Sequence, residues 1–140
     1  MKLFLEIETV SWPPQIEVMT KFIGFLIVFG LMSFTAKELF TQSGNASYYA
    51  NKFHGRRTSS GEKYHKDSMV CAHKTLPFGT LLKVTNKKND SVVYVRVIDR
   101  MGKSSPHIID LSMAAAKQLN FVRSGITKVT VEEIHKDSLR

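Results

Sequence analysis

Two short runs of alternating apolar and polar residues place the strongest constraint on the fold of this chain. Residues 80–85 (TLLKVT) and 91–98 (SVVYVRVI) both predict β-strands, because β-branched residues dominate them and the polar turn Asn-Lys-Lys-Asn-Asp joins them. In the second run Val93, Val95 and Val97 lie on one face and the residues between them lie on the other. The alternation predicts a strand with one buried face.

The rest of the chain continues the pattern of short strands. Weaker strand signals lie at residues 46–50, 69–73, 108–111 and 126–134. The residues from 51 to 68 are polar and predict a long loop. One helix is well signalled, since Ser112 can cap it and Asn120 can close it. Many short strands with a single helix favour a small all-β barrel over a sandwich or a parallel α/β sheet.

The first 36 residues have the layout of a targeting segment. Residues 22–36 form an uncharged run of 15 that follows Lys21, which is short of the roughly 20 needed to span a bilayer. A positive start, an apolar middle and small residues at the end are typical of a signal peptide. The glutamates before Lys21 are not, and Met19 offers an alternative start that leaves them out. We interpret this segment as a signal peptide or an uncleaved membrane anchor.

This interpretation divides the chain into four parts. We expect a targeting segment, a linker, one domain and a tail, at residues 1–36, 37–43, 44–134 and 135–140. Removing the first segment takes away two of the 20 basic and three of the 12 acidic residues, so the net charge rises from +8 to +9. A basic, exported domain favours a polyanionic partner such as a cell wall or an anionic lipid. Export argues against nucleic acid, and a membrane contact is expected only through an uncleaved first segment.

Several chemistries are excluded by the residues present. Cys71 is the only cysteine, which rules out an internal disulfide, a cysteine-based zinc site and a CxxC redox motif. The sequence has no GxGxxG or GxxxxGK[ST] phosphate loop and no HExxH motif. No two of the five histidines stand at i, i+4. We therefore expect neither a metal nor a cofactor.

Three carboxylates are candidates for acid/base chemistry. Asp99 directly follows the strongest strand signal, and we expect partial burial to raise its pKa so that it holds a proton near neutral pH. Asp110 stands in an apolar context just before Ser112, and Glu62 follows a Ser-Gly turn. Each also has a structural interpretation. Asp99 could form an ion pair with Arg100, Asp110 could bond the start of the helix, and Glu62 could be a solvated loop residue.

A histidine and a cysteine share the apolar run at residues 69–73. His73 is compatible with a catalytic role and equally with a hydrogen-bonded core position. Cys71 would lie on the same face of a strand as His73, which permits a Cys/His nucleophile pair, but a small buried thiol is the more ordinary interpretation.

Four segments give the chain a resemblance to a known family. The segments ASYYANKFHGRRTSSGEKY, CAHKTLPFGTLLKVTN, VVYVRVIDR and IIDLSMAAAKQL resemble, in order and spacing, the rare lipoprotein A (RlpA) family over about residues 44–133. The resemblance implies a six-stranded double-psi β-barrel related to expansins. It also implies a bacterial envelope protein that acts on peptidoglycan at the septum, with cell-division envelope proteins as partners.

The resemblance carries expectations for individual residues. The family's functional glutamate, histidine and aspartate fall on Glu62, His73 and Asp99, and an aspartate important in expansins falls on Asp110. Tyr48, Tyr49, Lys74 and Arg100 are expected in the substrate groove, since aromatic rings suit sugar faces and cations suit the carboxylates of muramic acid. The family usually reads Asp-Arg-Gly-Pro, whereas here Met101, Gly102 and Lys103 follow Asp99–Arg100.

The implied reaction is that of an endolytic lytic transglycosylase. Such an enzyme cleaves between N-acetylmuramic acid and N-acetylglucosamine in peptide-stripped glycan and leaves a 1,6-anhydro end. One carboxyl group, Asp99, would act first as acid and then as base, while Glu62 and His73 orient sugar hydroxyls or tune Asp99. The alternative is a non-catalytic, expansin-like module that binds peptidoglycan, which the altered loop after Arg100 favours.

Overall fold

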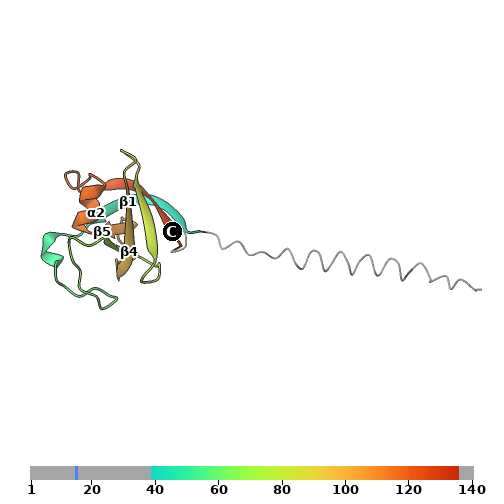
Figure 1. Cartoon of the computed structure of the whole chain (residues 1–140), viewed down its shortest axis with the longest axis horizontal. Coiled ribbons are helices and arrows are strands. Elements are labelled where there is room, and N and C mark those ends of the chain that lie inside the picture. Colours follow the sequence, from blue (N-terminus) through green and yellow to red (C-terminus); the bar gives the residue numbers. More distant parts are fainter. Residues whose placement is uncertain (1–14, 16–38, 136–140) are drawn as a thin grey trace, which may run out of the picture. The chain divides into compact units, whose positions relative to one another are not determined.

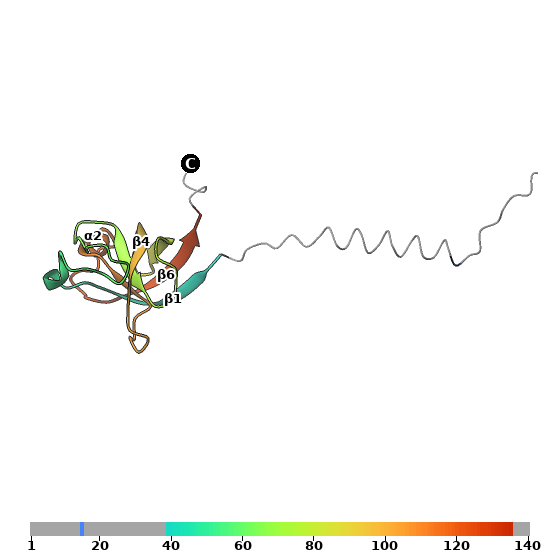
Figure 2. The same cartoon turned by 90° about the horizontal axis from the view of Figure 1, so that it is seen from below.

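The computed structural model describes residues 39–135 and the single position Gln15. Six strands form a closed barrel in the order β1-β5-β2-β4-β3-β6 (Figures 1 and 2). The strands are β1 (Thr41–Tyr48), β2 (Val70–His73), β3 (Leu81–Asn86), β4 (Val92–Arg100), β5 (Ile109–Leu111) and β6 (Thr127–Ile134). The short helices are η1 (Asn51–Phe53) and α2 (Met113–Gln118). The predicted all-β barrel with one α-helix in this part of the chain is confirmed.

Most strands lie where the sequence predicted them, and β1 is the main exception. It begins at Thr41, five residues before the predicted strand, so the last residues of the predicted linker belong to the barrel. The reason is tertiary, because residues 41–46 pair antiparallel with β6 although they lack an apolar alternation. The predicted targeting segment lies outside the described residues. Within the described part of the chain, no helix is long and apolar enough to cross a membrane.

Two parallel strand pairs interleave in the barrel. β1 pairs parallel with β5, and β2 pairs parallel with β4, while β5 and β2 run antiparallel to each other. The remaining pairs, β3 with β4 and both β1 and β3 with β6, are antiparallel. As a result the short strands β5 and β2 lie side by side although 35 residues separate their nearest ends in sequence. This arrangement gathers β5, β2 and β4 into one wall of the barrel.

The apolar side chains form a main core inside the barrel and a smaller cluster outside it. Val93, Val95 and Val97 belong to the main core, as their alternation predicted. The helix α2 adds Ala115 and Ala116 to this core, and its Ser112 cap accepts a hydrogen bond from the Ala115 N–H (3.2 Å), as the sequence predicted. The outer cluster consists of Tyr64, Val70 and Ile98 with Tyr49 and Phe53 packed on them. It joins the long loop between β1 and β2 to the outside of the wall.

A β-bulge in β4 decides which way its last residues point. Cys71 of β2 pairs with Val97, but the next residue, Ala72, pairs with Asp99, so Ile98 is the extra residue. If Ile98 were paired in regular register, Asp99 would continue the inward series of alternate valines, because side chains on a strand alternate between its two faces. The bulge instead puts Ile98 in the outer cluster and turns Asp99 to the outer face with its partner Ala72.

Candidate functional site

Four paired residues form a row across the outer face of the barrel wall. Ser47 of β1 pairs with Asp110 of β5, Asp110 pairs with Ala72 of β2, and Ala72 pairs with Asp99 of β4. Since paired residues on neighbouring strands point to the same face, the two carboxylates flank the small Ala72 side chain. With strands about 4.8 Å apart, their backbones are separated by roughly 10 Å. The barrel therefore brings together two of the predicted residues, Asp99 and Asp110.

Three donors hold the Asp99 carboxylate. The Tyr49 hydroxyl donates to Oδ2 at 2.6 Å, and the backbone N–H groups of Ser59 and Arg100 donate to Oδ1 at 2.8 Å each. Asp99 is half-buried. The orientation of this carboxylate is thus fixed from three separate segments: the end of β1, the long loop and β4 itself.

The Ser59 donor depends on a tight turn within the predicted loop. The Thr58 N–H donates to the Glu62 carbonyl (2.8 Å), and Gly61 adopts a positive φ of 89°, which favours glycine. The Ser60 N–H donates to the Ile98 carbonyl (3.2 Å), which attaches the turn to β4. The Ser-Ser-Gly sequence is therefore the element that places a backbone donor against Asp99.

The protonation of Asp99 differs from the sequence-based expectation. Burial alone raises the pKa of this carboxyl, as we expected, but the hydrogen bonds from Tyr49, Ser59 and Arg100 outweigh burial and hold its pKa below the ordinary value. The expectation of a raised pKa is therefore wrong for the protein without substrate. Asp99 is a carboxylate at neutral pH, because the hydrogen bonds that stabilise its ionised form outweigh the burial that disfavours it.

Aromatic contacts hold the Tyr49 ring in place, and the surroundings of its hydroxyl keep the phenol protonated. Its ring stacks on Tyr64 with centroids 4.5 Å apart and meets the Phe53 ring edge-to-face at 5.8 Å. Burial raises the pKa of the phenol strongly, and the hydrogen bond to Asp99 and the nearby negative charges of Asp99 and Asp110 raise it further. Asp110 in turn accepts a hydrogen bond from the Ser47 hydroxyl. The hydroxyl of Tyr49 is thus a donor and not a base.

Glu62 lies in the long loop between β1 and β2, where its carboxylate is already paired with Arg96 of β4. Its two carboxylate oxygens accept from the two terminal nitrogens of Arg96 at 2.7 and 2.9 Å, an exposed bidentate ion pair. The hydrogen bond from Arg96 lowers the pKa of Glu62. Glu62 therefore follows the turn that contacts Asp99 and presents an ionised, outward-facing carboxylate.

His73 lies on the opposite face of the wall from Asp99. It pairs with Arg100, one residue beyond the row, and is buried against the edge of Phe40. Its Nδ1 accepts from the N–H groups of Thr75 (3.3 Å) and Leu76 (3.1 Å), so Nε2 carries the proton and donates to Gln42 Oε1 at 3.3 Å. Burial, together with the charges of Arg100 and Lys74, lowers its pKa. In this structure His73 is a neutral residue that orders the turn after β2.

Cys71 shares the inner face with His73, as the sequence indicated. The thiol is fully buried in the main core, and this burial raises its pKa. A thiol that stays protonated at neutral pH is a poor nucleophile. The structure therefore supports the interpretation of Cys71 as a small core residue.

The expected groove residues divide between the two faces. Tyr49 contacts Asp99, whereas the Tyr48 hydroxyl donates to the Val122 carbonyl at 2.9 Å beside Phe121. Lys74 donates to the Ser105 carbonyl at 2.7 Å, which fastens the loop that follows β4.

Arg100 combines a backbone and a side-chain role. Its N–H donates to Asp99, and its guanidinium lies 4.1 Å from the ring centroid of Phe78, which is 43% exposed. The loop that contains Met101, Gly102 and Lys103 therefore begins at the end of β4. The cation–π contact and the hydrogen bond of Arg100 hold this strand end in place. The altered loop sequence does not displace the backbone donor to Asp99.

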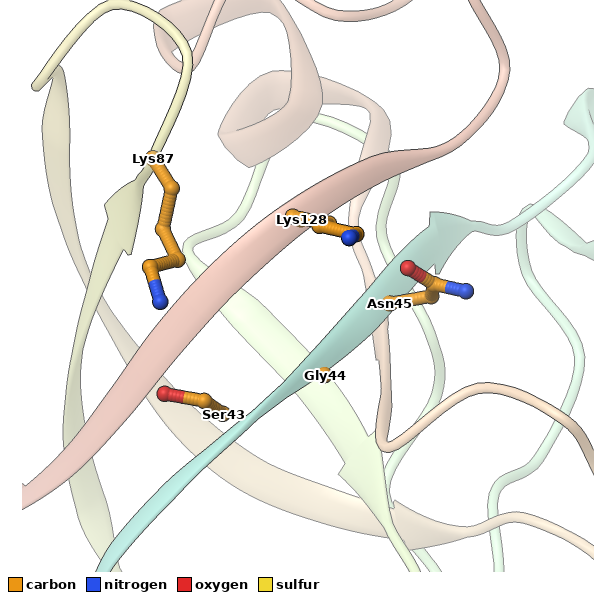
Figure 3. Close-up of a pocket in the computed structure, with 5 residues that line it drawn as sticks. All are labelled: Ser43, Gly44, Asn45, Lys87 and Lys128. Carbon is orange, nitrogen blue, oxygen red and sulfur yellow. The ribbon is translucent and has the colours of Figure 1, made fainter.

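Two shallow hollows lie away from the carboxylates. One, of about 240 Å³, is lined by Ser43, Gly44, Asn45, Lys87 and Lys128, which project from three adjacent segments (Figure 3). The other, of about 310 Å³, is lined by Lys117, Asn120, Val122 and Arg123. In the closed strand order β1, which carries Ser43, Gly44 and Asn45, lies opposite β4, so the first hollow is across the barrel from Asp99. Within residues 39–135 no three His, Cys, Asp or Glu side chains gather as a metal ion would require.

Several residues of the site carry no distinctive signal in the sequence. Ser47, Ser59 and Arg96 contact Asp110, Asp99 and Glu62, but Ser and Arg are common on protein surfaces. The Ser-Gly turn signal was visible, yet it gives no information about which distant carboxylate the turn contacts. Phe78 was visible only as part of the motif AHKTLPFGT.

A closed six-stranded barrel with two interleaved parallel strand pairs is the arrangement of the double-psi β-barrels. The family described as "Lytic transglycolase" matches residues 41–131. The chain is 50% identical over 95 residues to the endolytic peptidoglycan transglycosylase RlpA of Neisseria meningitidis serogroup A, covering 68% of this chain and 40% of that protein. It is 49% identical over 98 residues to the protein of the same name from Vibrio cholerae, covering 70% and 37%. The chain belongs to the RlpA family.

Solved structures support the fold. The expansin of Clavibacter michiganensis superposes with a TM-score of 0.57 at 22% identity, over 69% of this chain and 52% of that one. A Streptomyces papain inhibitor gives a TM-score of 0.55 at 22% identity, over 69% and 96%. The predicted relation to expansins is confirmed at the level of fold. The matched region is less than half the length of these RlpA relatives.

Proposed function

We propose that this chain is an endolytic peptidoglycan transglycosylase of the bacterial cell envelope and that Asp99 is its acid and base. The observation that carries the proposal is an ionisable carboxylate on the outer wall of the barrel, oriented by three donors and accessible from the solvent side. The names of the RlpA relatives support the reaction, and the family match over residues 41–131 spans all the segments that build the row.

The reaction needs one carboxyl group that acts twice. The Asp99 carboxyl gives its proton to the glycosidic oxygen as the bond from this oxygen to C1 of N-acetylmuramic acid breaks. The oxygen of the same sugar's 6-hydroxyl then bonds to C1, and its proton passes to the Asp99 carboxylate. The product carries a 1,6-anhydro ring, no water is consumed, and Asp99 ends protonated as it began.

The neighbouring residues have supporting roles in this proposal. Glu62, with Arg96, orients sugar hydroxyls beside the turn that holds Asp99. Asp110, fixed by Ser47, contacts the glycan at the other end of the row. His73 acts through the backbone, since the strand and turn that it orders pair with Arg100. Cell-division proteins of the envelope are proposed as partners.

A non-catalytic wall-binding module is the second candidate. The low pKa of Asp99 in the protein without substrate favours it, because an acid catalyst must first take up a proton. A carboxylate oriented by three donors has no evident use in a protein that only binds, which favours the enzyme.

Mass spectrometry of the soluble products separates these functions. The purified chain would be incubated with intact and with amidase-stripped peptidoglycan, next to Asp99→Asn and the control Asp67→Asn, which changes an exposed loop carboxylate. We expect 1,6-anhydromuramic acid ends from the unmodified chain and from Asp67→Asn, and a loss of about 100- to 10,000-fold from Asp99→Asn. Ordinary reducing ends would indicate a hydrolase with a second carboxylate, and wall binding without release would indicate a binding module.

A further inference from the structure

The donors to Asp99 differ in how freely they can leave it. Two are backbone N–H groups, from Ser59 in the tight turn and Arg100 in β4, and both are fixed by the hydrogen bonds of their own segments. The third is the Tyr49 hydroxyl, which can rotate about its C–O bond. A substrate oxygen that approaches the row can therefore compete for the Tyr49 donor without unfolding any element.

The Tyr49 ring would stay in place during such a change. Tyr64 stacks on it, Phe53 meets its edge, and the Tyr49 N–H donates to the Leu111 carbonyl at 3.0 Å. Tyr64 is in turn fixed, because its hydroxyl accepts from the Met113 N–H at 3.3 Å. The position of the ring therefore does not depend on the bond from its hydroxyl to Asp99.

The charges around the pair make Asp99 the group that exchanges a proton. Asp99 on β4 and Asp110 on β5 both act to keep the Tyr49 phenol protonated. The other charged groups on this wall are Arg100 and the ion pair of Arg96 with Glu62. Burial favours the neutral form of Asp99, and the hydrogen bonds oppose it. The balance at Asp99 therefore depends on how many donors it keeps.

We propose that Tyr49 is a positioning residue that couples the protonation of Asp99 to the binding of glycan. In the free protein its hydroxyl donates to Asp99 and holds the carboxylate ionised and oriented. When glycan covers the row, the hydroxyl turns to a sugar oxygen, and Asp99, now with one donor fewer and less water, takes up a proton from the solvent. This inference rests on the proposed acid/base role of Asp99, and it explains how a residue that is ionised at rest becomes an acid.

Carbon-detected NMR titration of the full chain tests the first half of this proposal without any activity measurement. Tyr49→Phe keeps the aromatic stack and removes the donor, so the pKa of Asp99 should rise by about one unit. Tyr94→Phe removes a hydroxyl from a half-exposed residue earlier on β4 and should leave that pKa unchanged. An unchanged pKa in a folded Tyr49→Phe chain overturns the proposal.

The reciprocal measurement covers the case in which Tyr49→Phe does not fold. Because two interacting groups shift each other's titration, Asp99→Asn should lower the pKa of the Tyr49 phenol. Ultraviolet absorbance then follows the ionisation of the four tyrosines with rising pH. One phenol should titrate earlier in Asp99→Asn than in the unmodified chain. Superimposable titration curves would show that the two groups are not coupled.

Steady-state kinetics on soluble, peptide-stripped glycan tests the coupling to substrate. The fall of kcat with rising pH reports Asp99 in the complex, and the fall of kcat/KM reports Asp99 in the free protein. We expect the first to occur at higher pH than the second, and Tyr49→Phe to bring the two together. Equal values in the unmodified chain contradict the coupling. If the unmodified chain cuts no glycan at any pH, the proposed function fails, while the NMR result still decides the role of Tyr49.

Discussion

The two faces of the β5-β2-β4 wall carry different polar chemistry on the same three strands. On the inner face His73 has all its ring nitrogens bonded, two of these bonds come from backbone N–H groups, and the Cys71 thiol is sealed in the core. On the outer face Asp99 is held in part by a hydroxyl that can rotate, and it is half-buried. A buried polar group that the backbone fully satisfies contributes to folding, whereas one held by an exchangeable donor can respond to a ligand.

Deletion of Ile98 should have the largest effect on the outer face. It removes the bulge, the Ile98 side chain from the outer cluster and the carbonyl that accepts from the Ser60 N–H, while Asp99, now directly after Val97, still faces outward by alternation. We expect the turn that carries the Ser59 donor to lose its register with Asp99 and the folded variant to release no glycan fragments detectable by mass spectrometry. Ile98→Ala is the matched control, since it keeps the bulge and its backbone bonds, should lower the free energy of unfolding by about 2–4 kcal/mol and should keep cleavage per folded molecule. A deletion variant that cuts glycan as well as Ile98→Ala would show that the bulge is not needed to orient Asp99.

His73→Ala should lower the free energy of unfolding by about 2–4 kcal/mol, because it leaves the Thr75 and Leu76 N–H groups without their acceptor in a buried turn. Urea unfolding measures the change. Leu82→Ala, a fully buried core residue on β3, serves as a control of similar cost. If His73 acts only through the fold, both variants should cut glycan equally well per folded molecule. A much larger loss in His73→Ala would assign His73 a direct part in the reaction.

The two faces should also respond to different pH ranges. The folded-state pKa of His73 is below its ordinary value of 6.5, so the unfolded chain binds the proton first as pH falls, and stability declines from about pH 6.5 down to the folded pKa. The folded-state pKa of Asp99 is below 3.8, so its contribution is complete above that value and is lost as pH falls through the folded pKa. Thermal unfolding at closely spaced pH values checks both ranges. His73→Gln should remove the decline of the melting temperature below about pH 6.5, and Asp99→Asn should remove the decline below pH 3.8.

Glu62→Gln should give the smallest change in stability. The ion pair of Glu62 with Arg96 is exposed, and such pairs contribute little to folding. We expect a melting temperature within error of the unmodified chain and a reduced rate of glycan cleavage, because the outward carboxylate is lost. Lys83→Met, which breaks the exposed pair of Lys83 with Glu132 on the other side of the barrel, is the control for stability and should leave cleavage unchanged. A large drop in melting temperature only for Glu62→Gln would mean that the pair holds the turn against β4.

Local patterns predicted the parts of this domain that local forces determine. The hairpin of β3 and β4 and the Ser112 cap follow from alternation and capping, and both are confirmed. The start of β1 was wrong because its residues have no apolar alternation and are ordered by pairing with β6. The only local sign of the bulge is the apolar pair Val97–Ile98 before Asp99, which is equally typical of an ordinary strand end, so the sequence did not show that Asp99 turns outward.

The sequence supplied candidate residues for the site, and their roles stay predictions. The order of motifs indicated Asp99, Glu62 and His73 as candidates, and the expected burial of Asp99 does raise its pKa, as one of several influences. The sign of the shift was wrong because donors from Tyr49 and Ser59, 50 and 40 residues away in sequence, outweigh burial. Such a sum over distant segments requires the folded arrangement.

Closure of the barrel has a consequence for how this domain meets other molecules. Every one of the six strands has a hydrogen-bonded neighbour on both sides, so the barrel offers no free strand edge to which a peptide or another copy could add as a further strand. Recognition must therefore use side chains, loops and the outer faces of the sheet. A barrel of this kind can work at high local concentration among crowded polymers without templating its own aggregation.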